Sequence, residues 1–161
     1  MDKKQRVISD YGKSVKHYNK RYAATQFEKF KILDGIELKG TILDLGGGTG
    51  LLGKYLKREL VNVDSSFAML EHSKETNICA DIDHLPFKSH SFDAVLSFTA
   101  LQNLPNFTRV FKEVARVSKG KFICSVLNKV DVKELAREAK ASFKIKEKSI
   151  CGEDIQFIAV L

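Results

Sequence analysis

A short apolar run that leads into a cluster of glycines is the feature that most constrains this chain. Residues 42–45 are apolar except for Asp44, as in a strand that is buried on both faces. Four of the next five residues are glycines, and an amphipathic helical pattern follows over 51–59. A strand that enters a helix through glycines lets the backbone approach a ligand and directs helix N–H groups toward it. The segment therefore predicts a ligand site, because a plain turn needs only one or two glycines.

The glycine spacing distinguishes this segment from a dinucleotide site. A dinucleotide fingerprint has the order G-x-G-x-x-G. Here Asp44 precedes glycines at every second position, which are Gly46, Gly48 and Gly50. A carboxylate beside a glycine loop suits a cationic amino-acid head group better than it suits phosphates. The arrangement resembles motif I of the class I methyltransferases that depend on S-adenosylmethionine (SAM).

Two further segments extend this resemblance. Residues 60–64 form a predicted second strand that ends at Asp64, whose short carboxylate can accept both hydroxyls of a ribose; capping the next helix is the alternative role. Residues 64–70 (D-S-S-F-A-M-L) resemble a signature of the ubiquinone-biosynthesis type within this family. Residues 81–87 (D-I-D-H-L-P-F) resemble the family's third motif. The chain is thus identified as a member of that group, which implies SAM as cofactor and S-adenosylhomocysteine (SAH) as product.

The resemblance also implies a set of cofactor-binding residues. Met69 would lie near the adenine, Asp81 would accept its amino group, and the N–H of Ile82 would meet a ring nitrogen. Tyr18 and Tyr22 would reach the methionine end from a leading helix, although core packing explains both tyrosines equally well. The candidates are Tyr18, Tyr22, Asp44, Gly46, Gly48, Thr49, Gly50, Asp64, Ser65, Met69, Asp81, Ile82, Phe98 and Gln102.

No catalytic residue is assigned from the sequence. Residues 91–98 predict a fourth strand and resemble the family segment S-F-D-x-V-x-S. Many relatives have a histidine in the next segment, whereas this chain has Gln102, which can orient a substrate but cannot act as a base. The chain has no N-P-P-Y segment, and this disfavours methylation of exocyclic base nitrogens or of glutamine by that motif's mechanism.

The order of the patterns predicts the fold. The expected α/β fold is Rossmann-like, with a seven-stranded, mostly parallel sheet, helices on both faces and an antiparallel C-terminal hairpin. It forms a single domain over 1–161, of which 1–14 are expected to be flexible. The remaining predicted helices are 9–38 (with a break at Gly12), 107–117 and 132–141, and the remaining predicted strands are 77–80, 121–127, 143–150 and 155–161.

Charge and segment lengths bear on the methyl acceptor. The net charge is +7, and residues 1–40 contribute +5 of it, which fits either a nucleic-acid-binding face or an ordinary solvated surface. Between Leu127 and Phe143 there is room for one helix only, so any lid inserted there is minimal. An open site favours RNA or another macromolecule as acceptor, or an activating partner subunit that completes the site. A small acidic metabolite, or a non-catalytic SAM-binding subunit, is the alternative.

Other sequence features point to a cytoplasmic protein without a metal centre. No run approaches the ~20 apolar residues of a membrane span, and no apolar signal core follows the N-terminus. The four histidines form no ligand pattern, and the three cysteines have no C-x-x-C spacing. Cys79 and Cys124 lie in predicted strands, so we expect both thiols to be buried.

Overall fold

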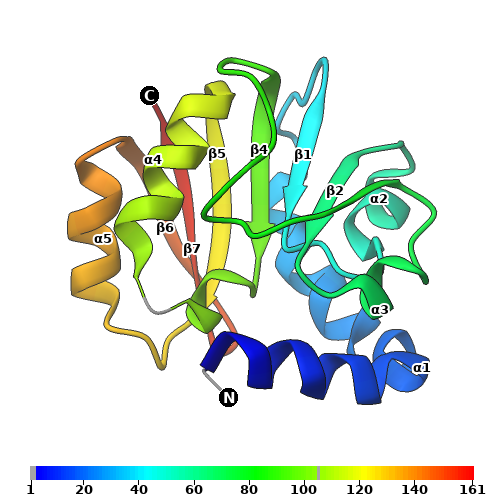
Figure 1. Cartoon of the computed structure of the whole chain (residues 1–161). Helices are drawn as coiled ribbons and strands as arrows, with labels where there is room; N and C mark the ends of the chain where they lie inside the picture. Colours follow the sequence, from blue (N-terminus) through cyan, green and yellow to red (C-terminus); the bar gives the residue numbers. More distant parts are fainter. Residues whose placement is uncertain (1–2, 105) are drawn as a thin grey trace.

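The computed structural model describes residues 3–104 and 106–161, with side chains at residue 15 and from residue 17 onward (Figure 1). Seven strands form one sheet in the order β3-β2-β1-β4-β5-β7-β6, in which β3 to β5 are parallel and β7 is antiparallel to both of its neighbours. This confirms the predicted sheet and its C-terminal hairpin. The strands are β1 (Ile42–Leu45), β2 (Val61–Asp64), β3 (Thr76–Cys79), β4 (Phe92–Phe98), β5 (Ser118–Leu127), β6 (Lys144–Cys151) and β7 (Asp154–Val160).

Helices cover both faces of the sheet, as predicted. Alternate residues of β1 point to opposite faces, so Leu43 packs in the core beneath α4 and α5, while Ile42 packs in the core beneath α1 and α2. Each helix buries one apolar face, such as Val110, Phe111 and Val114 of α4. The helices are α1 (Lys3–Phe30), α2 (Leu51–Leu56), α3 (Phe67–Leu70), α4 (Phe107–Val117) and α5 (Val132–Lys140), with short 3₁₀ turns η1 (Lys31–Leu33) and η2 (Leu101–Asn103).

The strand order places a crevice at the carboxyl ends of the strands, along one side of the sheet. β1 pairs with β2 on one side and with β4 on the other, so the connections that leave these strands turn to opposite sides. Ligands of open parallel sheets bind outside the carboxyl ends of the strands at such a switch point. Helix α1 runs along this edge of the sheet, at the bottom of the view (Figure 1).

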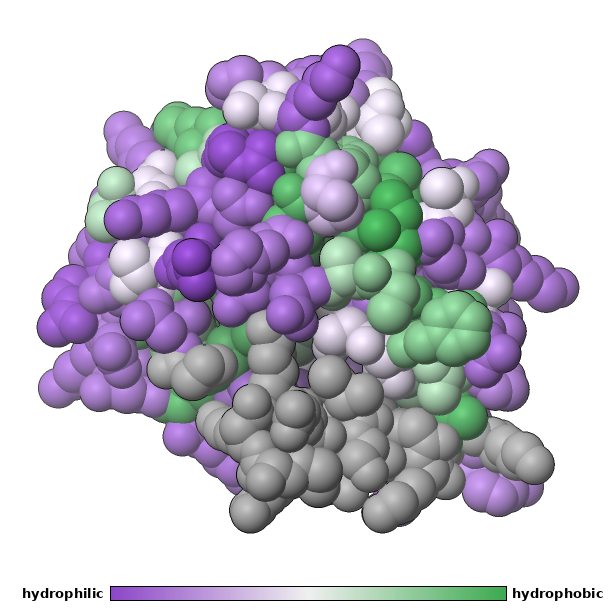
Figure 2. Space-filling model, in the orientation of Figure 1, coloured by the Kyte–Doolittle hydropathy of each residue, from purple (hydrophilic) through white to green (hydrophobic). Residues whose placement is uncertain are grey.

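The connection from β3 to β4 packs on the same face of the sheet as α4, but it contains no helix. Residues 80–91 contain no helix or strand, and their apolar side chains Ile82 and Leu85 are buried in the core beneath α4. Phe87 packs edge-to-face on Phe92 with the ring centroids 4.8 Å apart. Hydrophobic residues are visible as a strip in the middle of this otherwise mostly hydrophilic side (Figure 2). The loop thus serves as the cover of an apolar face.

Some details differ from the sequence predictions, and one prediction falls outside the described residues. Helix α1 begins at Lys3 and continues through Gly12 without the predicted break, because an internal glycine costs only about 1 kcal/mol. Cys79 is exposed because β3 is an edge strand, while Cys124 is buried as expected. The predicted flexibility of residues 1–14 lies outside the described side chains. In the part of the chain that is described, no helix has the length and apolar character of a membrane span.

Candidate functional site

A pocket of about 930 Å³, counted with its open mouth, lies at the carboxyl ends of β1, β2 and β4. Its floor is the turn between β1 and α2, and α1 and the turn after β4 form the opposite wall. The lining residues are Tyr18, Gln26, Phe30, Asp44, Gly46, Gly47, Gly48, Leu51, Leu52, Asp64, Ser65, Ser66, Met69, Ile82, Phe98, Thr99, Ala100, Asn103 and Leu104. The predicted glycine-rich ligand segment therefore forms part of a pocket.

The four glycine positions of the turn do not accept a side chain without strain or a clash. Gly46, Gly48 and Gly50 have φ angles of +76°, +54° and +75°, which L-residues with side chains rarely adopt. A Cβ atom at Gly47 would lie 2.2 Å from Asp44 Oδ2, so this position is closed for a different reason. The backbone alone therefore faces the pocket along the turn.

Asp64 is held against this turn by backbone donors. Its Oδ2 accepts a hydrogen bond from the Gly48 N–H (3.1 Å), and its Oδ1 accepts one from the Ser66 N–H (2.8 Å). Burial raises the pKa of Asp64, and these backbone hydrogen bonds oppose the rise. A carboxylate has about four acceptor sites, so two remain for a ligand diol. Asp64 thus orders the start of α3 through the Ser66 N–H, while its ribose contact stays a prediction; Ser66 itself makes no side-chain cap bond to α3.

Asp44 is a fully buried carboxyl group with an unsatisfied oxygen. Among the described residues, neither Asp44 Oδ2 nor Asn62 Oδ1 has a hydrogen-bond partner. Burial, and then the negative charges of Asp64 and Glu75, raise the pKa of Asp44 from 3.8 to about 8. A ligand cation beside Asp44 would relieve both the burial cost and the repulsion. The fit to the ammonium of an amino-acid head group is therefore good.

The two ends of the pocket differ in character. Beyond Asp64 at the end of β2, the lining toward β3 includes apolar side chains: Met69 Cε lies 3.0 Å from where a Cβ on Gly48 would stand, and Ile82 is buried. Toward β4 the wall is aromatic, because Phe98 and Phe30 of α1 meet edge-to-face with centroids 4.9 Å apart. A flat apolar group fits the β2–β3 end, and the aromatic wall closes the β4 end.

A buried ion pair supports the wall at the β4 end. Lys29 Nζ of α1 lies 2.9 Å from Asp154 Oδ1 of β7 and donates to Thr99 Oγ1 at 2.9 Å. Asp154 Oδ2 accepts hydrogen bonds from Ser125 (2.8 Å) and Thr99 (3.1 Å). Thr99 has a φ of +57°, which is an outlier for a β-branched residue and is held by these contacts. The cluster connects α1, β5, β7 and the pocket wall.

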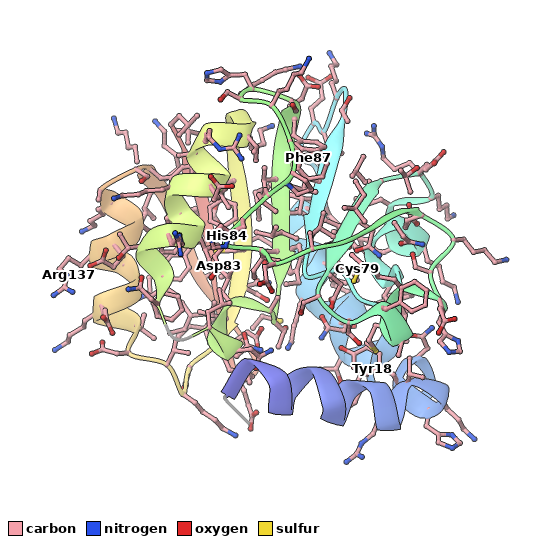
Figure 3. The ribbon with its side chains drawn as sticks, in the orientation of Figure 1. Tyr18, Cys79, Asp83, His84, Phe87 and Arg137 are labelled. Carbon is pink, nitrogen blue, oxygen red and sulfur yellow. The ribbon has the colours of Figure 1, made fainter. Side chains whose placement is uncertain are left out.

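The pocket contains most of the residues predicted as cofactor contacts. Tyr18 lies on the side of α1 that faces α3 (Figure 3), and the Gln102 side chain donates to the Thr99 carbonyl instead of reaching the pocket. The predicted residues that line the pocket are Tyr18, Asp44, Gly46, Gly48, Asp64, Ser65, Met69, Ile82 and Phe98.

The other predicted contacts have different surroundings. Thr49 donates to Asn19 of α1, and Gly50 is the N-cap of α2, where a Cβ would lie 2.5 Å from Ser73 Oγ. Asp81 is exposed on the β3–β4 connection, and Tyr22 is exposed with its ring 4.9 Å from that of Tyr18. None of these four lines the pocket among the described residues, and they remain expectations.

Sequence reasoning missed the polar residues of the α1 and β4 walls. Gln26 is nine-tenths buried and lines the pocket. The one indication of this in the sequence is its position four residues before Phe30, which places both residues on the same face of a helix. Thr99 and Asn103 line the same wall and lie in a segment for which the sequence suggested only Gln102. In the described part of the chain, no cluster of histidine, cysteine and acidic residues could hold a metal.

Known proteins share both the sequence pattern and the fold. The family described as "Methyltransferase domain" matches residues 43–124. The uncharacterized protein MJ1252 of Methanocaldococcus jannaschii is 35% identical over 86% of this chain and 56% of its own length. A malonyl-[acyl-carrier protein] O-methyltransferase of Hamiltonella defensa is 27% identical over 83% of this chain and 57% of its own length. The chain thus spans little more than half the length of these relatives.

Solved structures show the same fold across nearly the whole chain. Magnesium protoporphyrin IX methyltransferase from Synechocystis, crystallised with SAM, matches with a TM-score of 0.82 and 15% identity over 99% of this chain and 97% of that one. A methyltransferase in complex with the Haloferax volcanii Trm112 activator matches with a TM-score of 0.78 and 16% identity over 94% of each chain. The chain belongs to the methyltransferase domain family, whose cofactor is SAM.

Proposed function

We propose that this chain binds SAM in the pocket and transfers its methyl group to a small organic acceptor, leaving SAH. One observation carries the proposal: two carboxyl groups lie at the ends of adjacent strands, and their surroundings differ. Asp44 is buried with an unsatisfied oxygen, whereas Asp64 is held by two backbone N–H groups beside the glycine turn. SAM presents an ammonium and a ribose diol, which are the groups that these two carboxyl groups suit.

The strand order gives the cofactor a direction. Along the edge of the sheet, β3 is followed by β2, β1 and β4. Asp64 at the end of β2 would take the ribose, Met69 and Ile82 would contact the adenine, and Asp44 of β1 would pair with the ammonium. The methyl group, which the sulfonium makes electrophilic, would then lie toward β4 and the aromatic wall of Phe98.

The position of α1 supports a small acceptor. Tyr18, Gln26 and Phe30 of this helix line the pocket, so α1 serves as the lid that the short 127–143 segment does not supply. A large acceptor would have to present a narrow group beneath α1. The sequence suggested RNA or protein as the acceptor, or a partner subunit that completes the site. These are the alternatives to a small acceptor bound by this chain alone. The relatives named above include a malonyl-[acyl-carrier protein] O-methyltransferase.

Two measurements test the proposal. Calorimetric titration with SAM and SAH should show binding to one site, and Asp64→Asn should weaken it. Asp34→Asn is the matched control, because Asp34 is exposed and away from the pocket, and an amide still accepts its hydrogen bond from Tyr55. Incubation with methyl-labelled SAM and separate small-molecule, RNA and protein fractions should label the small-molecule fraction. Failure of SAM and SAH to bind the folded chain would contradict the proposal, and labelling of RNA or protein alone would refute the small acceptor.

A further inference from the structure

The β3–β4 connection, residues 80–91, is held in place mainly by contacts with other elements. It has no helix or strand of its own, yet it carries Ile82, which lines the apolar end of the pocket. Among the described residues, its backbone hydrogen bonds are few: the Ala80 N–H donates to the Asp64 carbonyl of β2, the His84 N–H to the Asp81 carbonyl, and the His90 N–H to the Arg116 carbonyl of α4. Asp83 and His84 lie where the loop reaches α4, and Phe87 lies further along it (Figure 3). The start of the loop is thus fixed at β2, and its middle at α4.

Glu113 and Arg116 of α4 bind the loop backbone on both sides of one residue. Glu113 Oε2 accepts a hydrogen bond from the Leu85 N–H at 2.8 Å. Arg116 Nη2 donates to the Leu85 carbonyl at 3.0 Å, and Nη1 donates to the Phe87 carbonyl at 2.6 Å. Both polar groups of the Leu85 backbone are thus satisfied by two neighbouring side chains.

The two side chains also fix each other. Arg116 Nε donates to Glu113 Oε1 and Nη2 donates to Oε2, both at 2.8 Å, in a two-pronged pairing that holds the planes of both groups. This contact is the largest cause of a lowered pKa of Glu113, and the Leu85 N–H lowers it further. Both residues lie on a helix whose opposite face is buried in the core, so their positions are set by the rigid part of the fold.

We infer that Glu113 and Arg116 are positioning residues for purine recognition by the cofactor site, an inference that rests on the proposed binding of SAM. They touch neither the pocket nor a ligand. They fix the backbone at Leu85, three residues after Ile82, while the Ala80 N–H is bonded to β2 two residues before it; the α4 contacts thus help to set where the Ile82 N–H lies. Adenine has an acceptor at ring nitrogen N1, whereas hypoxanthine has a donor there. A well-placed N–H distinguishes the two bases, and a displaced one does not.

The test compares two ligands that differ only in this base. Calorimetry measures the affinity of the full chain for SAH and for S-inosylhomocysteine, in which hypoxanthine replaces adenine. The wild-type chain should prefer SAH by at least about tenfold, the range expected when one buried polar group is mispaired. Arg116→Met and Glu113→Gln should weaken SAH binding by about tenfold and change binding of the hypoxanthine analogue by less than about twofold. The preference for adenine should therefore fall.

Controls separate positioning from general stability. Arg109→Met makes the same substitution at an exposed site on the same helix and should leave both affinities unchanged. Arg116→Lys retains a charge but cannot bind two carbonyls at once, so it should restore only part of the preference. If Arg116→Met does not fold, Glu113→Gln carries the test, because an amide can still accept from the Leu85 N–H but loses the charge that holds Arg116.

The outcomes are distinguishable. Equal weakening of both ligands, or no change in either, would overturn the inference, because a merely structural role cannot alter the preference between bases. A wild-type chain that binds SAH without preferring adenine would overturn it too. A wild-type chain that binds neither ligand would refute the proposed function itself.

Discussion

Replacement of Asp44 by asparagine should make the stability of the ligand-free protein less dependent on pH. In the folded chain, burial and the charges of Asp64 and Glu75 raise the pKa of Asp44 to about 8, from an ordinary value of 3.8. Between these two values the folded protein keeps a proton that the unfolded chain has released. The stabilisation of the protonated form is therefore complete below 3.8 and is lost as the pH rises toward 8.

The magnitude follows from the size of the pKa shift. One pKa unit corresponds to about 1.4 kcal/mol, so a rise from about pH 5.5 to about pH 8 should cost the wild-type chain about 3 kcal/mol through this group alone. Asparagine does not titrate and has nearly the same shape. Asp44→Asn should therefore remove this contribution and leave that of the other titrating groups.

Urea unfolding at several pH values between these limits measures the effect. The wild-type free energy of unfolding should fall by about 3 kcal/mol more than that of Asp44→Asn. Parallel pH profiles for the two proteins would refute the assigned state of Asp44. A second readout is the proton balance of SAH binding: its ammonium should favour the ionised carboxylate, so wild-type binding below pH 8 should release protons and Asp44→Asn should release fewer.

Three further substitutions test the site from other directions. Asp64→Asn should weaken SAH binding by about 1.5–3 kcal/mol in calorimetry, through the loss of charge-assisted hydrogen bonds. Gly47→Ala should destabilise the fold by about 1–3 kcal/mol in urea unfolding, because its Cβ would meet Asp44 Oδ2 at 2.2 Å. Lys29→Met should cost about 3–5 kcal/mol by leaving Asp154 buried without its cation, and the double variant Lys29→Met/Asp154→Leu should recover most of that loss. A double variant no more stable than the single one would contradict this account of the ion pair.

The parts of the site that the sequence predicted are local in the chain. Asp44, the glycines and Asp64 lie within one strand–turn–helix–strand unit, so their spacing alone determines that they meet at neighbouring strand ends. The seven strands were also predictable, because each apolar run matches a buried strand or an alternating one. Helix ends were less so: the helix predicted over 9–38 ends as α1 at Phe30, where a 3₁₀ turn begins.

The parts that the sequence did not predict depend on pairings between distant segments. Lys29 belongs to a lysine-rich stretch that suggests a solvated surface, yet it is buried because Asp154 lies 125 residues away in sequence but 2.9 Å away in space. The exposure of Cys79 depends on β3 being at the edge, and strand order is not encoded in the pattern of one strand. Thr99 adopts a left-handed conformation only because this tertiary environment holds it.

The buried cluster also explains how the C-terminal hairpin contributes to a pocket that it does not line. Gln156 of β7 donates to the Lys29 carbonyl at 2.7 Å, and Asp154 of the same strand binds the Lys29 side chain and Thr99. The backbone and the side chain of Lys29 are thereby both fixed to β7, and Phe30, the next residue, packs against Phe98. The folded hairpin therefore helps to keep α1 in place against the β4 wall. In this fold, the antiparallel strands at the far side of the sheet are part of what shapes the β4 end of the pocket.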